Sequence, residues 1–153
     1  MSNDILTLVW FKRDLRVLDH APLTDAAEIG RVLPVYVIEP EVIEAADFDA
    51  LHWDFIRESL IDLNTSLEKL GVSLFIQLGE VCDVFQRLHQ QFGFTQIFAH
   101  EETGNALSYC RDRRLARWAK SAGVTFKETP QNGVVRRLED RDAVSYTHLR
   151  AHE

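Results

Sequence analysis

Two short polar segments carry the side chains of this sequence that could do chemistry. The first runs from Lys12 to His20 and holds three basic residues and two carboxylates without a glycine. Such a segment can pair within itself, with Asp14 bound to the arginines so that the loop is fixed, and the residues favour this interpretation. The alternative is that one arginine faces an anionic ligand or a partner domain.

The second polar segment is His100-Glu101-Glu102. Two neighbouring carboxylates could accept hydrogen bonds from the amino and ring N–H groups of a heterocycle. They could equally be acidic residues at the start of a helix, where the helix dipole stabilises negative charge. From the residues alone, the helix-start interpretation is favoured.

Several classes of site are not predicted. The segment 12–20 has no glycine to let the backbone approach a pyrophosphate, so an NAD-type site is not expected. The sequence contains no Walker A loop and no Gly-x-Ser-x-Gly elbow, so no phosphate loop and no catalytic residue are predicted. No metal-ligand spacing links His20, His52, His89 and His100, so no metal site is predicted.

Short apolar, β-prone runs alternate with amphipathic segments along the chain. The runs predict five strands, at 5–11, 32–38, 73–78, 95–99 and 124–126. The amphipathic segments predict helices at 22–29, 51–70, 80–92 and 104–122. This alternation predicts an α/β fold: a doubly wound, Rossmann-like, five-stranded parallel sheet with helices on both faces. Ligands of such a sheet bind at the carboxyl ends of the strands, where the segments 12–21, 39–50 and 100–105 are expected.

Two details of the pattern make finer predictions. Pro34 is discordant with a strand at 32–38, because proline cannot donate to a sheet; it either weakens the prediction of that strand or marks a strand start near Val35. The last helix is expected to turn Cys110 inward. Its basic residues, among them Arg111 and Arg117, predict either a solvated face or a surface that docks the rest of a longer protein.

The length and the net charge of the chain limit which kinds of protein it can be. The chain has 153 residues, a net charge of −7 and a pI near 5.3, which predicts one domain, or one domain with a tail, that is poorly suited to a general electrostatic grip on nucleic acid. No apolar run approaches the ~18–20 residues of a membrane span. Cys82 and Cys110 form neither a zinc set nor a disulfide framework. We therefore expect a cytoplasmic monomer.

One stretch resembles the opening of the photolyase/cryptochrome family. Residues 8–16 read Leu-Val-Trp-Phe-Lys-Arg-Asp-Leu-Arg and residues 19–23 read Asp-His-Ala-Pro-Leu; the family reads roughly L-V-W-F-R-x-D-L-R and then D-N-x-A-L. Residues 35–38 resemble the family's second strand, and residues 100–103 its fourth-strand exit. Residues 131–136 resemble the start of its interdomain linker, and the resemblance extends from Ile5 to about Asp142.

The resemblance implies a domain organisation and a function. Residues 1–130 would be the N-terminal α/β domain, which holds a light-harvesting antenna chromophore (a folate, a deazaflavin or a flavin), and residues 131–142 the start of the linker. A larger helical C-terminal domain, missing from this chain, would hold FAD and the DNA lesion. In the family, the antenna passes light energy to reduced FAD, which splits a pyrimidine dimer, and cryptochromes use the same architecture for signalling.

The resemblance also implies the place of the antenna and the order of the strands. The third strand would lie at one edge, followed by the second, first, fourth and fifth, with the crevice at the carboxyl ends of the first and fourth. In the family, part of a folate site comes from the missing domain, whereas a flavin or deazaflavin lies deeper in this one. The candidate cofactor-binding residues are Phe11, Lys12, Arg13 and Asp14, opposite Glu101 and Glu102.

The chain departs from the family at three points. Without the helical domain, this chain alone is expected to be inactive in repair, and its expected partners are that domain and, in the full-length parent only, damaged DNA. His20 stands where many members have Asn. Residues 143–153 do not resemble family sequence and are expected to be an artefactual tail, with a genuine short C-terminal extension as the alternative. In either case they are expected to add nothing to the fold. A photolyase parent is favoured over a cryptochrome by family frequency; the alternative is a free-standing nucleotide-binding, stress-type or electron-transfer-flavoprotein-like module.

Overall fold

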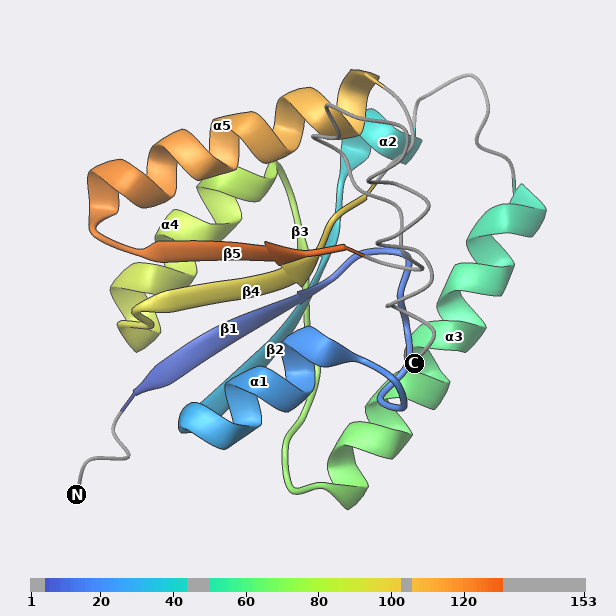
Figure 1. Cartoon of the computed structure of the whole chain (residues 1–153). Coiled ribbons are helices and arrows are strands. Elements are labelled where there is room, and N and C mark those ends of the chain that lie inside the picture. Colours follow the sequence, from blue (N-terminus) through green and yellow to red (C-terminus); the bar gives the residue numbers. More distant parts are fainter. Residues whose placement is uncertain (1–4, 44–49, 103–105, 131–153) are drawn as a thin grey trace, which may run out of the picture.

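The computed structural model describes residues 5–43, 50–102 and 106–130, which form one α/β sheet domain (Figure 1). The strands are β1 (Leu6–Phe11), β2 (Arg31–Ile38), β3 (Phe75–Leu78), β4 (Gln96–His100) and β5 (Thr125–Thr129). The helices are α1 (Ala21–Ile29), α2 (Pro40–Ile43), α3 (Ala50–Lys69), α4 (Val81–Phe92) and α5 (Ala106–Ala122). The predicted tail and linker, residues 131–153, lie outside the described residues.

The five strands form a parallel sheet in the order β3-β2-β1-β4-β5. The fold class and the strand order are therefore confirmed. The central strand β1 pairs with β2 on one side, where Leu8 lies opposite Leu33, and with β4 on the other, where Leu8 lies opposite Ile97. The order of the strands reverses between β1 and β4, and a doubly wound sheet opens a crevice at that point.

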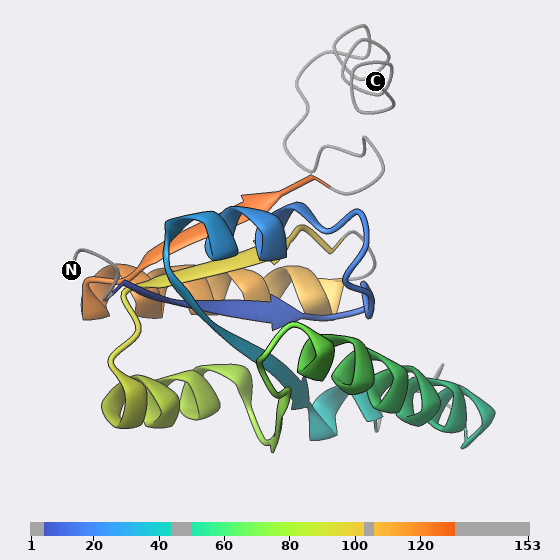
Figure 2. The same cartoon turned by 90° about the horizontal axis from the view of Figure 1, so that it is seen from below.

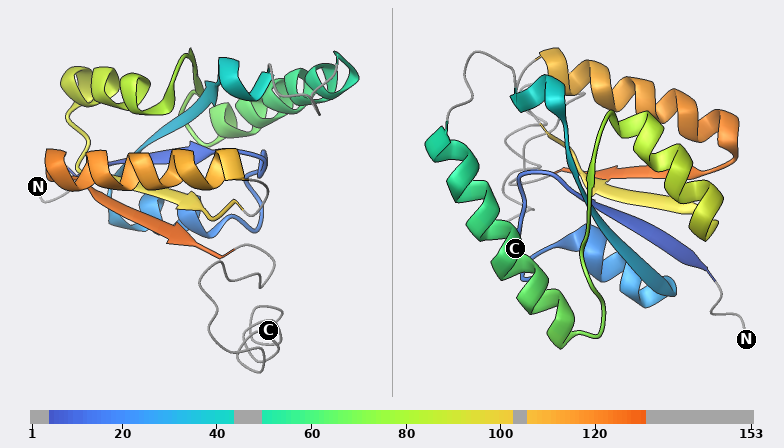
Figure 3. Two further views of the ribbon diagram at one scale, coloured as in Figure 1. Left: turned by 90° about the horizontal axis from the view of Figure 1, so that it is seen from above. Right: turned by 180° about the vertical axis from the view of Figure 1, so that it is seen from behind.

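Side chains of alternate residues in the central strands pack into two hydrophobic cores, one on each face of the sheet. Trp10 of β1 packs with Phe85 of α4 and Leu115 of α5 in one core. Phe11 packs with Leu23 of α1 and with Leu67 and other residues of α3 in the second core. The view from behind shows α4 and α5 on one face of the sheet and α1 and α3 on the other (Figure 3, right). Of the strand residues, Trp10, Val35, Val37, Ile97 and Phe98 are buried, and Phe75, on the edge strand, is half-buried.

The helix boundaries follow from local capping. His20 caps α1, because its Nδ1 accepts a hydrogen bond from the N–H of Leu23 at 3.1 Å. Glu80 caps α4 through the N–H of Asp83, and Gly93 ends that helix in the left-handed region, at φ 69°. Such caps satisfy backbone groups that the helix itself leaves unpaired. The short helix α2 was not predicted; it lies in the segment 39–50, which was expected only as the connection after the second strand.

Pro34 lies inside β2, so the alternative that this strand starts near Val35 is wrong and the predicted run from residue 32 holds. The strand begins at Arg31, and Pro34 lies opposite Val9 of β1. The edge strand β3 pairs with β2 only from Val35 onward. At Pro34 the strand therefore has a single neighbour, a position where a residue without an N–H is tolerated.

The N-terminal part of α3 extends past the carboxyl ends of the strands (Figure 2). The predicted apolar stripe of this helix therefore divides into two parts. Leu60, Leu63 and Leu67 are buried in the core, while Trp53 and Ile56 are only half-buried. No helix in the described part of the chain is long and apolar enough to cross a membrane.

Candidate functional site

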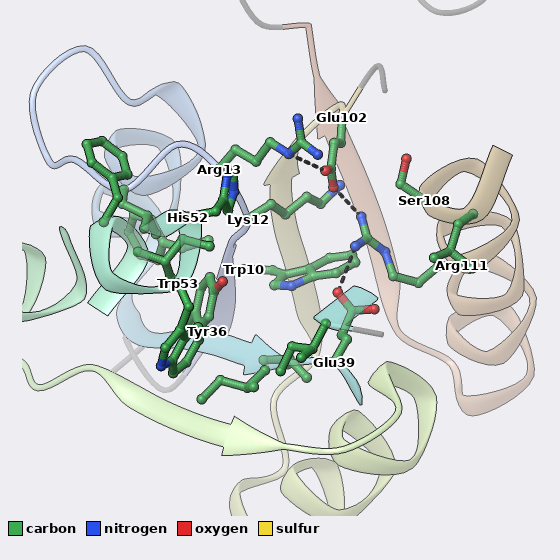
Figure 4. A pocket seen from close by; sticks show the side chains of 18 residues that line it. Trp10, Lys12, Arg13, Tyr36, Glu39, His52, Trp53, Glu102, Ser108 and Arg111 are labelled. Atoms are coloured by element: carbon green, nitrogen blue, oxygen red, sulfur yellow. Dashed lines mark hydrogen bonds and ion pairs between the residues drawn. The ribbon is translucent and has the colours of Figure 1, made fainter. Parts of the chain in front are cut away.

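A pocket of about 270 Å³ opens at the carboxyl ends of β1 and β2, between α3 and α5 (Figure 4). Its aromatic and aliphatic walls come from β1, β2, α2, α3 and α5, and its polar wall joins the loops after β1, β2 and β4 to α5. The lining residues that carry the argument below are Trp10, Phe11, Lys12, Arg13, Tyr36, Glu39, His52, Trp53, Phe55, Ile56, Glu102 and Arg111. A largely apolar cavity with a few convergent polar groups is the usual form of a small-molecule site.

Four of the six candidate cofactor-binding residues that the resemblance implies line this pocket. Phe11, Lys12, Arg13 and Glu102 line it. Asp14 and Glu101 are not among its lining residues; Asp14 is buried elsewhere in the same loop, and the backbone N–H of Glu101 bonds the carbonyl of Thr129.

Arg111 is the centre of the polar wall. Its Nη1 lies 2.8 Å from Glu39, its Nη2 2.5 Å from Glu102 and its Nε 2.9 Å from Asp112. The side chain is only 6% exposed. Burial alone would lower the pKa of Arg111, but the carboxylates of Glu39, Asp112 and Glu102 outweigh it and raise that pKa. One guanidinium thus ties the end of β2, the loop after β4 and α5 together.

Lys12 is held from the opposite side of the same wall. Its Nζ lies 3.1 Å from Asp112 and 3.5 Å from Glu128. The Nζ of Lys12 lies 4.4 Å, and the Cζ of Arg111 4.7 Å, from the centre of the Trp10 ring. These are cation–π distances, so the indole is fixed by two charged neighbours as well as by the core.

Arg13 completes a row of alternating charges along the pocket. Its Nε lies 3.1 Å from Glu102, which also binds Arg111, which binds Glu39 in turn. Burial is the main cause that raises the pKa of Glu39, with Glu102 adding to it and Arg111 opposing it. Burial and the same two carboxylates raise the pKa of Tyr36 to about 12, so its hydroxyl stays protonated at neutral pH.

Asp14 pairs with histidines, so the prediction that it binds the arginines of its own loop is wrong. Its Oδ2 lies 2.6 Å from Nε2 of His20 and 2.7 Å from Nδ1 of His100, and its Oδ1 accepts the N–H of Lys12. Arg16 instead donates to the carbonyls of Leu18 and Asp19. The loop is indeed fixed by Asp14, but through α1 and β4.

Asp14, His20 and His100 lie close enough together to suggest a set of metal ligands. No pattern in the sequence indicates that these histidines meet; the fold brings them together at the start of α1 and the end of β4. Because Nδ1 of His20 accepts the N–H of Leu23, the ring proton must sit on Nε2, which then donates to Asp14. That nitrogen has no lone pair for a metal, so the geometry supports a hydrogen-bonded cluster that holds the loop.

The comparisons with known proteins bear on this geometry. The family model described as DNA photolyase matches residues 7–144. The chain belongs to the DNA photolyase family. Cryptochrome DASH of Arabidopsis thaliana is 36% identical over 105 residues, which cover 64% of this chain and 18% of that protein.

Solved structures of photolyases have the same fold. A class III photolyase from Agrobacterium tumefaciens matches with a TM-score of 0.79 and 25% identity, over 90% of this chain and 28% of that one. An archaeal photolyase from Sulfolobus tokodaii, solved with two FAD molecules, matches with a TM-score of 0.77 and 23% identity, over 93% of this chain and 34% of that one. At 23% identity, the similarity to the Sulfolobus tokodaii structure shows a shared fold alone.

These matches place the chain as the N-terminal domain of a photolyase or cryptochrome, as the resemblance implied. The chain spans about a fifth to a third of the length of these relatives. The alternative of a free-standing nucleotide-binding, stress-type or electron-transfer-flavoprotein-like module is not favoured.

Proposed function

We propose that this photolyase-family domain binds the light-harvesting antenna chromophore in the pocket between α3 and α5, and that the chromophore is a flavin or deazaflavin. Members of the family bind FAD and antenna chromophores. The observation that carries the proposal is the aromatic and aliphatic pocket with one charged wall, located where a doubly wound sheet binds ligands.

The walls of the pocket suit a flat ring system. Trp53 and Ile56 of α3 and Tyr36 of β2 all line the pocket. Trp53 and Tyr36 lie on the side of the pocket away from Arg111 (Figure 4). Pockets for drug-sized ligands have volumes of roughly 300–1,000 Å³. A cavity of about 270 Å³ accordingly suits the ring system of a chromophore, with its side chain outside.

The charged wall matches the polar edge of a flavin-type ring. Arg13, Glu102 and Arg111 present donor, acceptor and donor groups in sequence. The pyrimidinedione edge of a flavin or deazaflavin carries a carbonyl, an N–H and a second carbonyl, which is the complementary order. A pterin carries two neighbouring donors at this edge, so the row favours a flavin-type ring over a folate.

The residues of the chain bind, orient and shield the ring. When bound, the chromophore supplies light absorption and energy transfer to FAD. Glu102 would accept the ring N–H, and the network around Arg111 fixes that carboxylate in place. The apolar wall from α3 excludes water from one ring face, and hydrogen bonds in such a site are stronger than in water.

The remaining features of the parent protein are proposals of the same kind. Family frequency favours a photolyase that repairs pyrimidine dimers in DNA by light, with FAD in a C-terminal helical domain, over a cryptochrome. We propose domain limits at 1–130 for the antenna domain and 131–142 for the linker, with a foreign tail at 143–153. A cytoplasmic, monomeric protein is supported by the composition.

Glu102→Gln tests the proposed site, with Glu101→Gln as its matched control on the neighbouring position. A charge-assisted hydrogen bond contributes roughly 1.5–3 kcal/mol, so loss of the Glu102 carboxylate should weaken riboflavin binding about ten- to a hundredfold. Glu101→Gln should leave the affinity within about twofold, because that residue does not line the pocket. The dissociation constants are measured by equilibrium dialysis, after circular dichroism has shown each variant to be folded.

Equal affinity of all three proteins would remove Glu102 from the site. A loss confined to Glu101→Gln would place the chromophore outside this pocket. Tighter binding of a folate than of riboflavin by the unmodified chain would contradict the flavin-type assignment.

A further inference from the structure

We propose that His20 is a positioning residue of the pocket, which acts through Asp14 and His100 on the two strand exits that carry the charged wall. This inference rests on the proposed function, because it concerns the same pocket, but it does not depend on which chromophore binds there. His20 is not among the residues that line the pocket, so its effect on a ligand must pass through the residues between them.

The segments that leave β1 and β4 are joined by side chains. The backbone pairing of these two strands ends at Trp10 and Ala99. Beyond it, Oδ2 of Asp14 in the loop after β1 accepts a hydrogen bond from Nδ1 of His100, the last residue of β4, at 2.7 Å. This contact therefore sets how the two segments lie relative to each other as they leave the sheet.

The charged wall of the pocket lies next to this contact along both segments. Arg13 precedes Asp14, Glu102 comes shortly after His100, and the Nε of Arg13 lies 3.1 Å from Glu102. The Arg13 side chain is 66% exposed, whereas those of Asp14 and His100 are 1% and 6% exposed. An exposed ion pair contributes little by itself, while a buried hydrogen bond to a charged group contributes more. The buried contact therefore determines where the backbone presents Arg13 and Glu102 to a ligand.

His20 fixes Asp14 from a third element, α1. Its Nε2 donates to Oδ2 of Asp14 at 2.6 Å, and its Nδ1 accepts the N–H of Leu23 in the first turn of α1 at 3.1 Å. The centre of the same ring lies 4.7 Å from that of Phe11, which lines the pocket. The side chain of His20 is fully buried, so the ring is held between α1, Phe11 and Asp14.

Two substitutions separate the two hydrogen bonds of His20. His20→Gln places an amide N–H near the position of Nε2, so it can still donate to Asp14, but it is a poor cap for α1. His20→Ser keeps a hydroxyl that caps α1, but its side chain is too short to reach Asp14. If His20 acts on the pocket through Asp14, His20→Ser should disturb the pocket and His20→Gln should preserve it.

Hydrogen exchange of the unliganded 153-residue chain, followed by NMR for each amide, tests the coupling without a chromophore. In His20→Ser the N–H groups of Lys12 and Glu101, which form hydrogen bonds at the two strand exits, should exchange about tenfold faster than in His20→Gln. The N–H of Leu23, which reports the cap of α1, should show the opposite order. Equal exchange of Lys12 and Glu101 in the two variants would reduce His20 to a helix cap and overturn the proposal.

Riboflavin binding, measured by equilibrium dialysis on variants that circular dichroism has shown to be folded, tests the consequence for the pocket. His20→Gln should bind within about threefold of the unmodified chain, and His20→Ser should bind about five- to tenfold more weakly. Equal affinity of the two variants, or weaker binding by His20→Gln, would overturn the role of His20 while the proposed function stands. If the unmodified chain binds no riboflavin, the proposed function fails, and the exchange rates alone decide whether His20 holds the two exits together.

Discussion

Replacing Arg111 with methionine is expected to lower the free energy of unfolding by about 3–5 kcal/mol, which is the usual cost of removing one partner from a buried ion pair. Methionine fills a similar volume but leaves the carboxylates of Glu39, Glu102 and Asp112 buried without the cation that binds all three. For a chain of this size the midpoint of thermal unfolding should fall by on the order of 10 °C. Urea unfolding at pH 7 measures the free energy directly.

Arg117→Met is the matched control for this experiment. It removes an arginine from the same helix at an exposed position, so it should change the free energy of unfolding by less than about 0.5 kcal/mol. Adding Glu39→Gln to Arg111→Met should restore part of the loss, because one of the three carboxylates is then neutral. A loss below about 1 kcal/mol in Arg111→Met would show that water reaches the carboxylates and that the network is not a stabilising unit.

The inward face of α5 explains why Arg111 could not be recognised from the sequence. The apolar residues Leu115 and Ala119 define the buried face correctly. One turn earlier the same face carries Arg111 and Asp112, which are buried, while Cys110 points outward. The prediction that Cys110 turns inward is wrong, because a hydrophobicity pattern assigns charged residues to solvent unless their partners are known. Of those partners, Glu39 lies 72 residues away in the sequence and Glu102 nine residues away, outside the helix.

The architecture of the sheet was predictable because it depends on local signals. Apolar runs predicted five strands, and the amphipathic segments between them predicted four of the helices. The strand order came from the family resemblance, since no local pattern specifies which strands are neighbours. The sequence alone could not show that β2 includes Pro34. Proline is tolerated there because β3 starts to pair with β2 only at Val35.

The sequence predicts which loops form the site, but it does not predict which of their side chains face the pocket. The segments after β1 and β4 do meet, as the sheet topology requires. Side chains alternate between the two faces of a strand, and His100 shares the α1 face with Phe98. This alternation sends His100 toward His20 and Asp14 and away from the pocket. Trp53 and Tyr36 were missed because their elements reach the pocket only in the folded sheet. Glu39 was expected at this edge only as part of the segment 39–50, and not as a residue of the site.

Replacing Asp14 with asparagine is expected to lower the free energy of unfolding by about 2–4 kcal/mol at pH 7. The side chain keeps its size but loses the negative charge that accepts hydrogen bonds from His20 and His100. Both histidines are buried, and His20 also caps α1. A weakened cluster therefore loosens the start of α1 and the loop after β1 together.

The pH dependence separates this charge effect from a simple loss of packing. Burial alone would raise the pKa of Asp14, but the hydrogen bonds from His100 and His20 outweigh it and hold that pKa well below its usual range. A lowered pKa means that the stabilisation is complete above the ordinary carboxyl pKa of about 4 and is lost as the pH falls below it. The difference in unfolding free energy between the unmodified chain and Asp14→Asn should accordingly shrink by up to about 1.4 kcal/mol per pH unit below pH 4. Urea unfolding from pH 7 to pH 3 measures it, with the exposed Asp19→Asn as the control in the same loop. A difference that stays constant over this range would mean that Asp14 acts through its shape and not through its charge.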